Sequence, residues 1–310
     1  MSVPPVAAGP TYASVAPSPA SVGPRDDARR EADAWVGRRR ETRTRHGLEE
    51  AELADFHRRG YTLRRGLFES EEIARVNHLV DTDPLISKAV YGLSDSGGAL
   101  TELALWHHLS EDVFGALARS ARIVDNAEAM LGGEACFYHS KLTLKRPKVG
   151  GAWDWHQDYG YWYRAGYLLP HMLSVFVALD PSTRENGCLQ VLEGSHELGR
   201  IEHGVVAEQV GADPARLEQA RARFPLVHCE MEPGDVLFFH ANLLHGSGPN
   251  LSEKSRNVLI SAYNRVDNAP FIERENNGHT PIEETLDDAA LAQWLERPLD
   301  PSRRFDNAAV

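Results

Sequence analysis

The sequence is short of cysteine, of net positive charge and of long apolar runs. Its three cysteines, Cys136, Cys188 and Cys229, are far apart and form no CxxC pair. This spacing argues against a disulfide framework and against a cysteine zinc site. We therefore expect reduced, mostly buried thiols and a reducing, cytoplasmic location. No stretch approaches the roughly 18 consecutive apolar residues of a membrane helix, so no membrane association is predicted.

The formal net charge is −12, from 33 basic and 45 acidic residues. This balance argues against a nucleic-acid partner, because such binding depends on neutralising phosphates with basic side chains. The N-terminus lacks the basic start and continuous apolar run of a secretory signal. Residues 1–24 are rich in proline, and residues 25–47 are dense in arginine. We expect residues 1–47 to form a disordered or helical extension and residues 48–310 to form a single domain.

Helical patterns come first along the chain, and strand patterns follow. Apolar spacing predicts a helix before Gly60, a second helix near residues 69–83 and further helix over 102–132. From about residue 135 to 266, short apolar runs alternate with turn residues, which predicts a β-sandwich or barrel. One last helix is expected within 281–297. The class is thus mainly β with packed helices, or α+β.

Residues 153–162, WDWHQDYGYW, contain the first candidate metal ligands. In a strand, His156 and Asp158 would point to the same face, with Gln157 turned away. His245 ends a later apolar strand, and Arg256 begins the next one. Two imidazoles and one carboxylate are typical of non-haem Fe(II) oxygenases, which keep positions open for other ligands.

A bidentate co-substrate and O₂ would fill those open positions. 2-Oxoglutarate chelates iron through its 2-oxo acid end, and its far carboxylate needs a planar cation such as Arg256. Each residue taken alone has a simpler explanation, as a hydrogen-bonded pair, a loop histidine or a surface arginine. His240 and His228 compete with His245 as the third ligand. The combination and its order favour the iron site.

Four segments then carry a resemblance to a known family. They are WHQDYGYW (155–162), NGCLQVLEGSHELG (186–199), EPGDVLFFHANLLHGSGPN (232–250) and SRNVLISAYN (255–264). With a weaker match at residues 60–76, they resemble the phytanoyl-CoA dioxygenase family of Fe(II)/2-oxoglutarate-dependent oxygenases. The resemblance implies a double-stranded β-helix, or cupin-like jelly roll, with its core at about 135–266 and helices packed on one sheet.

The resemblance also implies roles for individual residues. It makes His156, Asp158 and His245 the iron ligands, which settles the choice of third histidine. Arg256 would hold the far carboxylate of 2-oxoglutarate. The other residues implied at the co-substrate are Ser247, Leu142 and Ser174. Trp162 would face the organic substrate.

The implied reaction couples decarboxylation of 2-oxoglutarate to succinate with oxidation of an unactivated C–H bond, most simply hydroxylation. Desaturation, ring closure and epoxidation stay open as alternatives. Halogenation is disfavoured because the carboxylate of Asp158 is present. Two alternative functions belong to other classes of protein. One is a zinc hydrolase, which would give Arg256 no role, and the other is a non-catalytic jelly-roll binding protein.

The substrate is expected to be a small organic molecule held by aromatic contacts. Tyr161 and Trp153 join Trp162 as candidates from the aromatic run, half of which should be core because alternate strand residues face away. A basic run is either an anion-binding group or a solvated strand end. It consists of Lys141, Lys145, Arg146 and Lys148. The substrate's identity and the oligomeric state are left open.

Overall fold

The computed structural model describes residues 46–272, 278–301 and 303–306. The expected extension, residues 1–47, therefore lies almost wholly outside the described residues. The described helices are α2 (Glu50–Arg59), α3 (Ser70–Thr82), α4 (Pro84–Ala89), α5 (Val113–Ala118), α6 (Ala121–Leu131), α7 (Asp158–Trp162), α8 (Pro214–Arg221) and α9 (Asp288–Leu295). None of these helices is long and apolar enough to cross a membrane.

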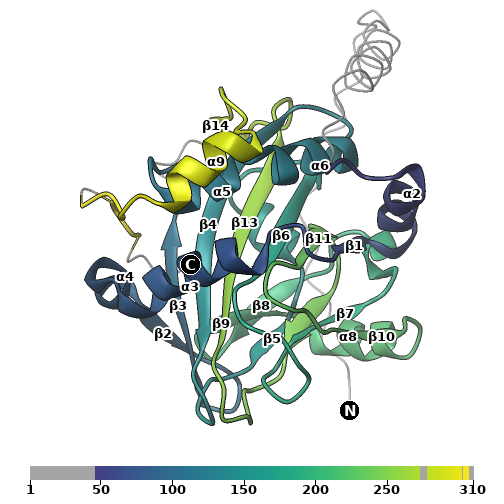
Figure 1. The fold of residues 1–310 in the computed structure, drawn as a ribbon. Helices are drawn as coiled ribbons and strands as arrows, with labels where there is room; N and C mark the ends of the chain where they lie inside the picture. The colour runs from purple at the N-terminus through teal and green to yellow at the C-terminus, as the bar shows by residue number, and fades with distance from the viewer. Residues whose placement is uncertain (1–45, 273–277, 302, 307–310) are drawn as a thin grey trace, which may run out of the picture.

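A large antiparallel sheet forms the centre of the molecule (Figure 1). In spatial order it contains β1 (Tyr61–Arg64), β11 (Val236–His240), β6 (Met172–Ala178), β13 (Arg256–Arg265), β4 (Ala135–Lys145), β3 (Leu100–Trp106) and β2 (Tyr91–Ser94). The short β14 (Thr280–Pro281) also pairs with β4. Strands β1, β2 and β3 precede residue 135, so the N-terminal part of the domain contributes both edges of this sheet.

A smaller antiparallel sheet lies against part of the large one. Its order is β10 (Leu226–Cys229), β7 (Leu189–Leu192), β12 (His245–Ser247) and β5 (Trp153–His156). A separate hairpin is formed by β8 (His203–Val206) and β9 (Gln209–Ala212). This architecture is the jelly roll that the sequence resemblance implied.

Alternating side chains of β6 show how the two faces of the large sheet differ. Leu173, Val175 and Val177 belong to the main core, which includes apolar residues of α3, α5, α6 and α9. These helices cross one face of the sheet in Figure 1. Phe176 and Ala178 point the other way, into an apolar layer shared with the smaller sheet. Because successive strand residues face opposite sides, one strand serves both layers.

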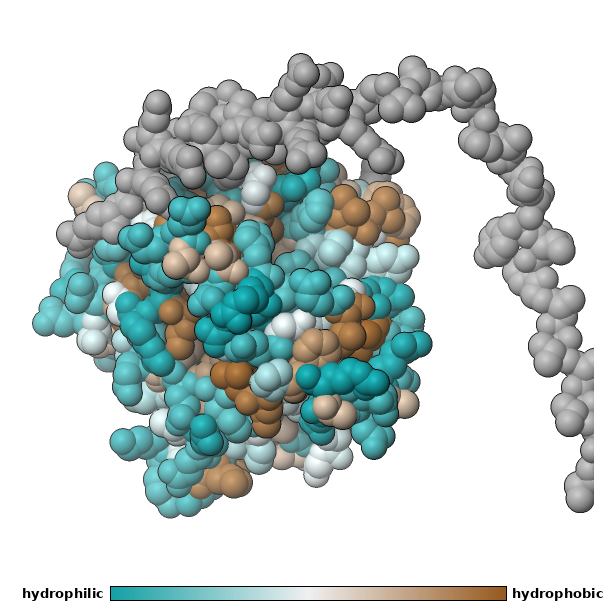
Figure 2. All heavy atoms as spheres, turned by 90° about the vertical axis from the view of Figure 1, so that its right-hand side faces the viewer, coloured by the Kyte–Doolittle hydropathy of each residue, from teal (hydrophilic) through white to brown (hydrophobic). Residues whose placement is uncertain are grey.

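One face of the molecule is mostly polar. Figure 2 shows hydrophilic residues over most of the visible face, with apolar residues in small separate groups. The three cysteines are buried and unpaired, as the sequence predicted.

Most of the expected elements are present. The first helix ends at Gly60, which adopts a left-handed φ of 81° and is followed by β1, and α3 begins at Ser70 as predicted. The expectation of helix over 102–132 is wrong at its start, because residues 100–106 form β3. This segment is an added strand of the large sheet, beside β4. The last helix, α9, lies within the expected residues 281–297.

Candidate active site

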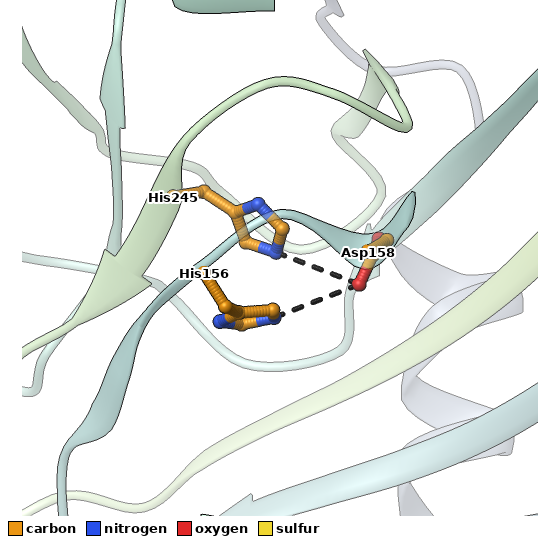
Figure 3. Close-up of side chains that lie close together, drawn as sticks. All are labelled: His156, Asp158 and His245. Atoms are coloured by element: carbon orange, nitrogen blue, oxygen red, sulfur yellow. Dashed lines mark ion pairs between the residues drawn. The ribbon is translucent and has the colours of Figure 1, made fainter. Parts of the chain in front are cut away.

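Three side chains from separate elements converge between the two sheets (Figure 3). His156 ends β5, Asp158 begins α7, and His245 begins β12. The two histidines are direct cross-strand neighbours. Their Nε2 atoms lie 3.6 Å (His156) and 3.8 Å (His245) from Oδ1 of Asp158. One ligand atom of each residue lies within 4.8 Å of the others, and all three residues are buried.

The local backbone differs from the expected continuous strand. The strand ends at His156, and Asp158 occupies the first turn of α7. Gln157 turns away, as expected, and its amide nitrogen donates to the carbonyls of Gly199 (2.8 Å) and Asn242 (2.7 Å). These bonds secure the turn that brings Asp158 back towards His156.

Backbone carbonyls orient both imidazoles. Nδ1 of His156 lies 2.7 Å from the Asp154 carbonyl oxygen, and Nδ1 of His245 lies 2.9 Å from that of Leu243. A carbonyl can only accept, so each Nδ1 carries a proton, and Nε2 is the atom that each ring can offer to a metal ion. Burial and the neighbouring His156 lower the pKa of His245 to about 3, so this ring is neutral at pH 7.

Asp158 is held in its ionised form by its surroundings. Burial opposes ionisation, but His245 and His156 outweigh it and hold the pKa of the carboxyl well below its usual range. The hydroxyl of Ser174 donates to Oδ2 at 2.6 Å. Oδ1 is thereby left to face the two Nε2 atoms. Two imidazoles and one carboxylate form a donor set that fits a divalent ion of the Fe(II) type.

The two competing histidines lie elsewhere. His240 accepts a hydrogen bond from the backbone N–H of Asn242, and its ring packs against His196 and Phe56. His228 lies in β10 beside Cys188. Among the described residues, the triad is the one group of His, Cys, Asp or Glu side chains close enough to share a metal ion.

A pocket extends from the triad between the two sheets. It holds about 460 Å³ of empty space, part of which is open to solvent. Its apolar walls include Phe176, Leu189, Phe239 and Ile260. Its polar lining, apart from the triad, consists of Thr101, Lys141, Thr143, Lys145, Ser247 and Arg256.

Arg256 lies in this pocket with unused donors. Its side chain is 2% exposed, and its Nε and Nη1 atoms have no hydrogen-bond partner within the described chain. Burial lowers the pKa of Arg256 to about 10, so the guanidinium is still charged at pH 7. A buried, charged donor pair is costly unless an anion binds to it. Arg256 therefore fits the far carboxylate of 2-oxoglutarate.

Lys145 is a second buried cation beside Arg256. The two residues are direct cross-strand partners in β4 and β13. The Lys145 ammonium donates to Oγ of Ser247 at 2.8 Å and to the carbonyl of Gly248. The expectation for Ser247 is thus consistent with its place in the pocket. The sequence analysis included Lys145 only in the basic run. The alternation of residues along β4 was the signal that could have predicted its side chain to face the pocket.

Other expected site residues are distributed differently. Leu142 packs in the core under the helices, on the face of β4 opposite the pocket, so it does not line the co-substrate site. Ser174 donates a hydrogen bond to Asp158, which lines the pocket, but Ser174 is not itself a lining residue. Strand alternation explains the placement of Leu142, because Lys141, Thr143 and Lys145 occupy the inward positions of β4.

The three aromatic candidates also separate. Trp153 lines the pocket. Trp162 is 3% exposed and belongs to an aromatic core cluster with Tyr138 and Tyr167, outside the pocket lining. Tyr161 packs edge-on against His156 with ring centroids 5.5 Å apart, and its hydroxyl donates to the carbonyl of Val210. Tyr161 therefore supports a triad ring from behind.

Comparison with known proteins identifies the family. The model of the phytanoyl-CoA dioxygenase (PhyH) family matches residues 56–258. The chain belongs to this family. An L-proline trans-4-hydroxylase of Streptomyces griseoviridis is 32% identical over 179 residues, which cover 53% of this chain and 67% of that protein. An ectoine dioxygenase of Stutzerimonas stutzeri is 28% identical over 247 residues, covering 73% and 81%.

Solved structures agree with the fold. The structure of EctD from S. alaskensis with bound Fe has a TM-score of 0.64 and 25% identity to this PhyH-family chain, and the match covers 79% of this chain and 90% of that one. The expected fold, enzyme class and cofactors are thereby confirmed: this is an Fe(II)/2-oxoglutarate-dependent oxygenase that uses O₂. The zinc-hydrolase and non-catalytic alternatives lose their support.

Proposed function

We propose that this protein hydroxylates a C–H bond of a small polar organic molecule, with His156, Asp158 and His245 holding the iron. When bound there, Fe(II) with 2-oxoglutarate and O₂ supplies the oxidation of an unactivated C–H bond, coupled to decarboxylation of 2-oxoglutarate to succinate. Arg256 would hold the far carboxylate of 2-oxoglutarate, with Lys145 and Ser247 beside it.

The chain's own residues perform the other tasks. Ser174 keeps Oδ2 of Asp158 occupied, so that Oδ1 is offered towards the histidines. The carbonyls of Asp154 and Leu243 keep both Nε2 lone pairs available. Phe176 and Phe239, with the other apolar wall residues, exclude water, which strengthens each polar contact within the pocket.

One observation carries the co-substrate assignment. Arg256 is a fully buried guanidinium with two donors that nothing in the described chain satisfies, and it lines the same pocket as the triad. A zinc hydrolase has no use for such a group, whereas a 2-oxo diacid needs a cation at its far end.

The relatives support the substrate class. Proline and ectoine are small, polar, ring-containing molecules with unactivated C–H bonds, and they are the substrates named for the two relatives above. Desaturation, ring closure and epoxidation use the same cofactors. Mass spectrometry separates hydroxylation from desaturation and ring closure, because only insertion of oxygen adds its mass to the product.

An anaerobic titration tests the proposal. Metal-free protein is titrated with Fe(II) and then 2-oxoglutarate, and the visible charge-transfer band of the chelate is followed. Wild type should show the band, and Arg256→Ala should need at least about 100-fold more 2-oxoglutarate, because it loses a bidentate, charge-assisted contact. Arg216→Ala is the matched control, since Arg216 is exposed on α8. No band in wild type at saturating iron and 2-oxoglutarate would reject the proposal.

A further inference from the structure

Lys141 and Trp153 meet across the pocket from opposite sheets. Lys141 lies in β4 of the large sheet, and Trp153 begins β5 of the small sheet. The Lys141 ammonium lies 5.2 Å from the centroid of the Trp153 ring. Both residues line the pocket that contains the triad. The contact is a cation–π interaction, which orients the ammonium without supplying a negative charge.

Lys141 differs from the other members of the basic run. Arg146 pairs with Glu102 at 2.7 Å, and Lys148 pairs with Glu253 at 2.8 Å, both outside the pocket. Lys145 donates to Ser247 and Gly248. For Lys141, the described part of the chain provides neither a hydrogen-bond acceptor nor an ion-pair partner within contact distance. Lys141 is half-buried in the pocket wall, so an anion in the pocket would meet an ammonium whose donors are unused.

Lys141 lies away from the residues that would hold the far carboxylate of 2-oxoglutarate. Across the sheet, Arg256 is the partner of Lys145, whereas Ile260 is the partner of Lys141. Four residues of strand separate the Cα atoms of the two lysines by about 13 Å. Lys141 thus lies towards the end of the pocket that holds Asp158, whose negative charge favours the charged form of the lysine. A second ligand beside the metal would have its anionic group near this lysine.

We propose that Lys141 binds a carboxylate of the organic substrate, with Trp153 forming the opposing wall of that subsite. The inference rests on the proposed function, because it places the substrate beside the triad. The ammonium of Lys141 would hold one end of the substrate, so that a C–H bond further along the molecule faces the metal. Neutral molecules of the same shape would lack this anchor. The enzyme should therefore select acids over their amides.

Binding measurements on matched ligand pairs test this role. The probes are acetate, butyrate, cyclopentanecarboxylate and L-proline, each with its primary amide. Each is titrated calorimetrically, without oxygen, into the complex of the full-length protein with Fe(II) and 2-oxoglutarate. In wild type the acids that bind should do so at least about 10-fold more tightly than their amides, since one charged hydrogen bond contributes this much.

Variants then assign the preference to Lys141. Lys141→Met should weaken the acids roughly 10- to 100-fold and leave the amides unchanged, so that the preference disappears. Lys141→Arg should keep part of the preference for acids over amides. The affinity for 2-oxoglutarate, read from its chelate band, should stay within about threefold of wild type, because Arg256, which holds its far carboxylate, is a separate residue of the pocket. Lys88→Met is the control, since Lys88 is exposed on α4.

Three results would overturn the role of Lys141. The first is an acid preference that survives Lys141→Met. The second is a large loss of 2-oxoglutarate affinity in that variant, which would place the lysine at the co-substrate. The third is a wild-type protein that binds 2-oxoglutarate normally but binds no acid more tightly than its amide. A wild-type protein without the chelate band would instead reject the proposed function, and this inference with it.

Discussion

Lys145 and Arg256 face each other across strands β4 and β13, and both cations point into one pocket. Neither forms an ion pair with a carboxylate in the described residues. Burial and the neighbouring Arg256 hold the pKa of Lys145 well below its usual range. Two like charges at opposed positions destabilise the free protein. An anion between Lys145 and Arg256 would offset this repulsion. The far carboxylate of 2-oxoglutarate is such an anion.

Lys145→Met should therefore separate binding from stability. The affinity for 2-oxoglutarate should fall by roughly 10-fold, because one of two cations is lost. The free energy of unfolding of the metal-free protein should change by less than about 1 kcal/mol, since a buried charge beside Arg256 is removed together with its two hydrogen bonds. The chelate band and urea unfolding measure the two quantities. Lys254→Met, at an exposed site, is the control, and unchanged affinity in Lys145→Met would place the lysine outside the co-substrate site.

Ser174 is predicted to tune the metal site without touching the ion. Ser174→Ala removes the hydrogen bond to Oδ2 of Asp158, so the carboxylate is free to rotate. We expect Fe(II) affinity to fall by about 10- to 100-fold, which is typical for the loss of such a supporting contact. Competition with a chelator of known affinity measures it. Ser140→Ala is a matched control, because Ser140 is a buried hydroxyl of the same sheet that bonds to Ser261. Equal loss in both variants would mean a general effect on the sheet.

Metal binding should stabilise the fold. The triad joins β5, α7 and β12, so an ion held there links the small sheet to the turn that follows it. At a free Fe(II) concentration of 100 times Kd, the stabilisation is about 2.7 kcal/mol, or a rise in Tm on the order of 5 °C. Anaerobic thermal unfolding with and without a chelator measures this shift. His245→Ala should show no shift, and a shift of the same size in that variant would place the ion elsewhere.

The two tryptophans should respond in opposite ways. Trp162→Phe leaves a cavity in the aromatic core beside Tyr138, so unfolding should become easier by about 1–3 kcal/mol. Trp153→Leu changes the pocket wall, so it should raise the substrate KM and leave stability closer to that of wild type. Urea unfolding and initial-rate kinetics measure the two effects. If Trp162→Phe raised KM without loss of stability, Trp162 would be a substrate residue after all.

Periodicity was enough to predict much of the fold. The helix ending at Gly60, the helix α3 and the strand texture from about 135 to 266 all follow from local spacing and turn residues. Residues 102–106 were predicted to be helical but lie in strand β3. Their strand conformation depends on pairing with β4, which lies more than thirty residues away and leaves no local trace in the sequence.

Residue types and their order made His156 and Asp158 candidate metal ligands and Arg256 a candidate anion-binding residue. The third ligand stayed open among His245, His240 and His228 until the family resemblance favoured His245. Only the tertiary structure decided which side chains of β4 and β6 face the pocket. It turned Leu142 into the core, placed Ser174 on Asp158, and brought Lys145 beside Arg256. The physical reason is strand register: a change of one residue exchanges the two faces of a strand, and register is set by cross-strand partners far away in the chain.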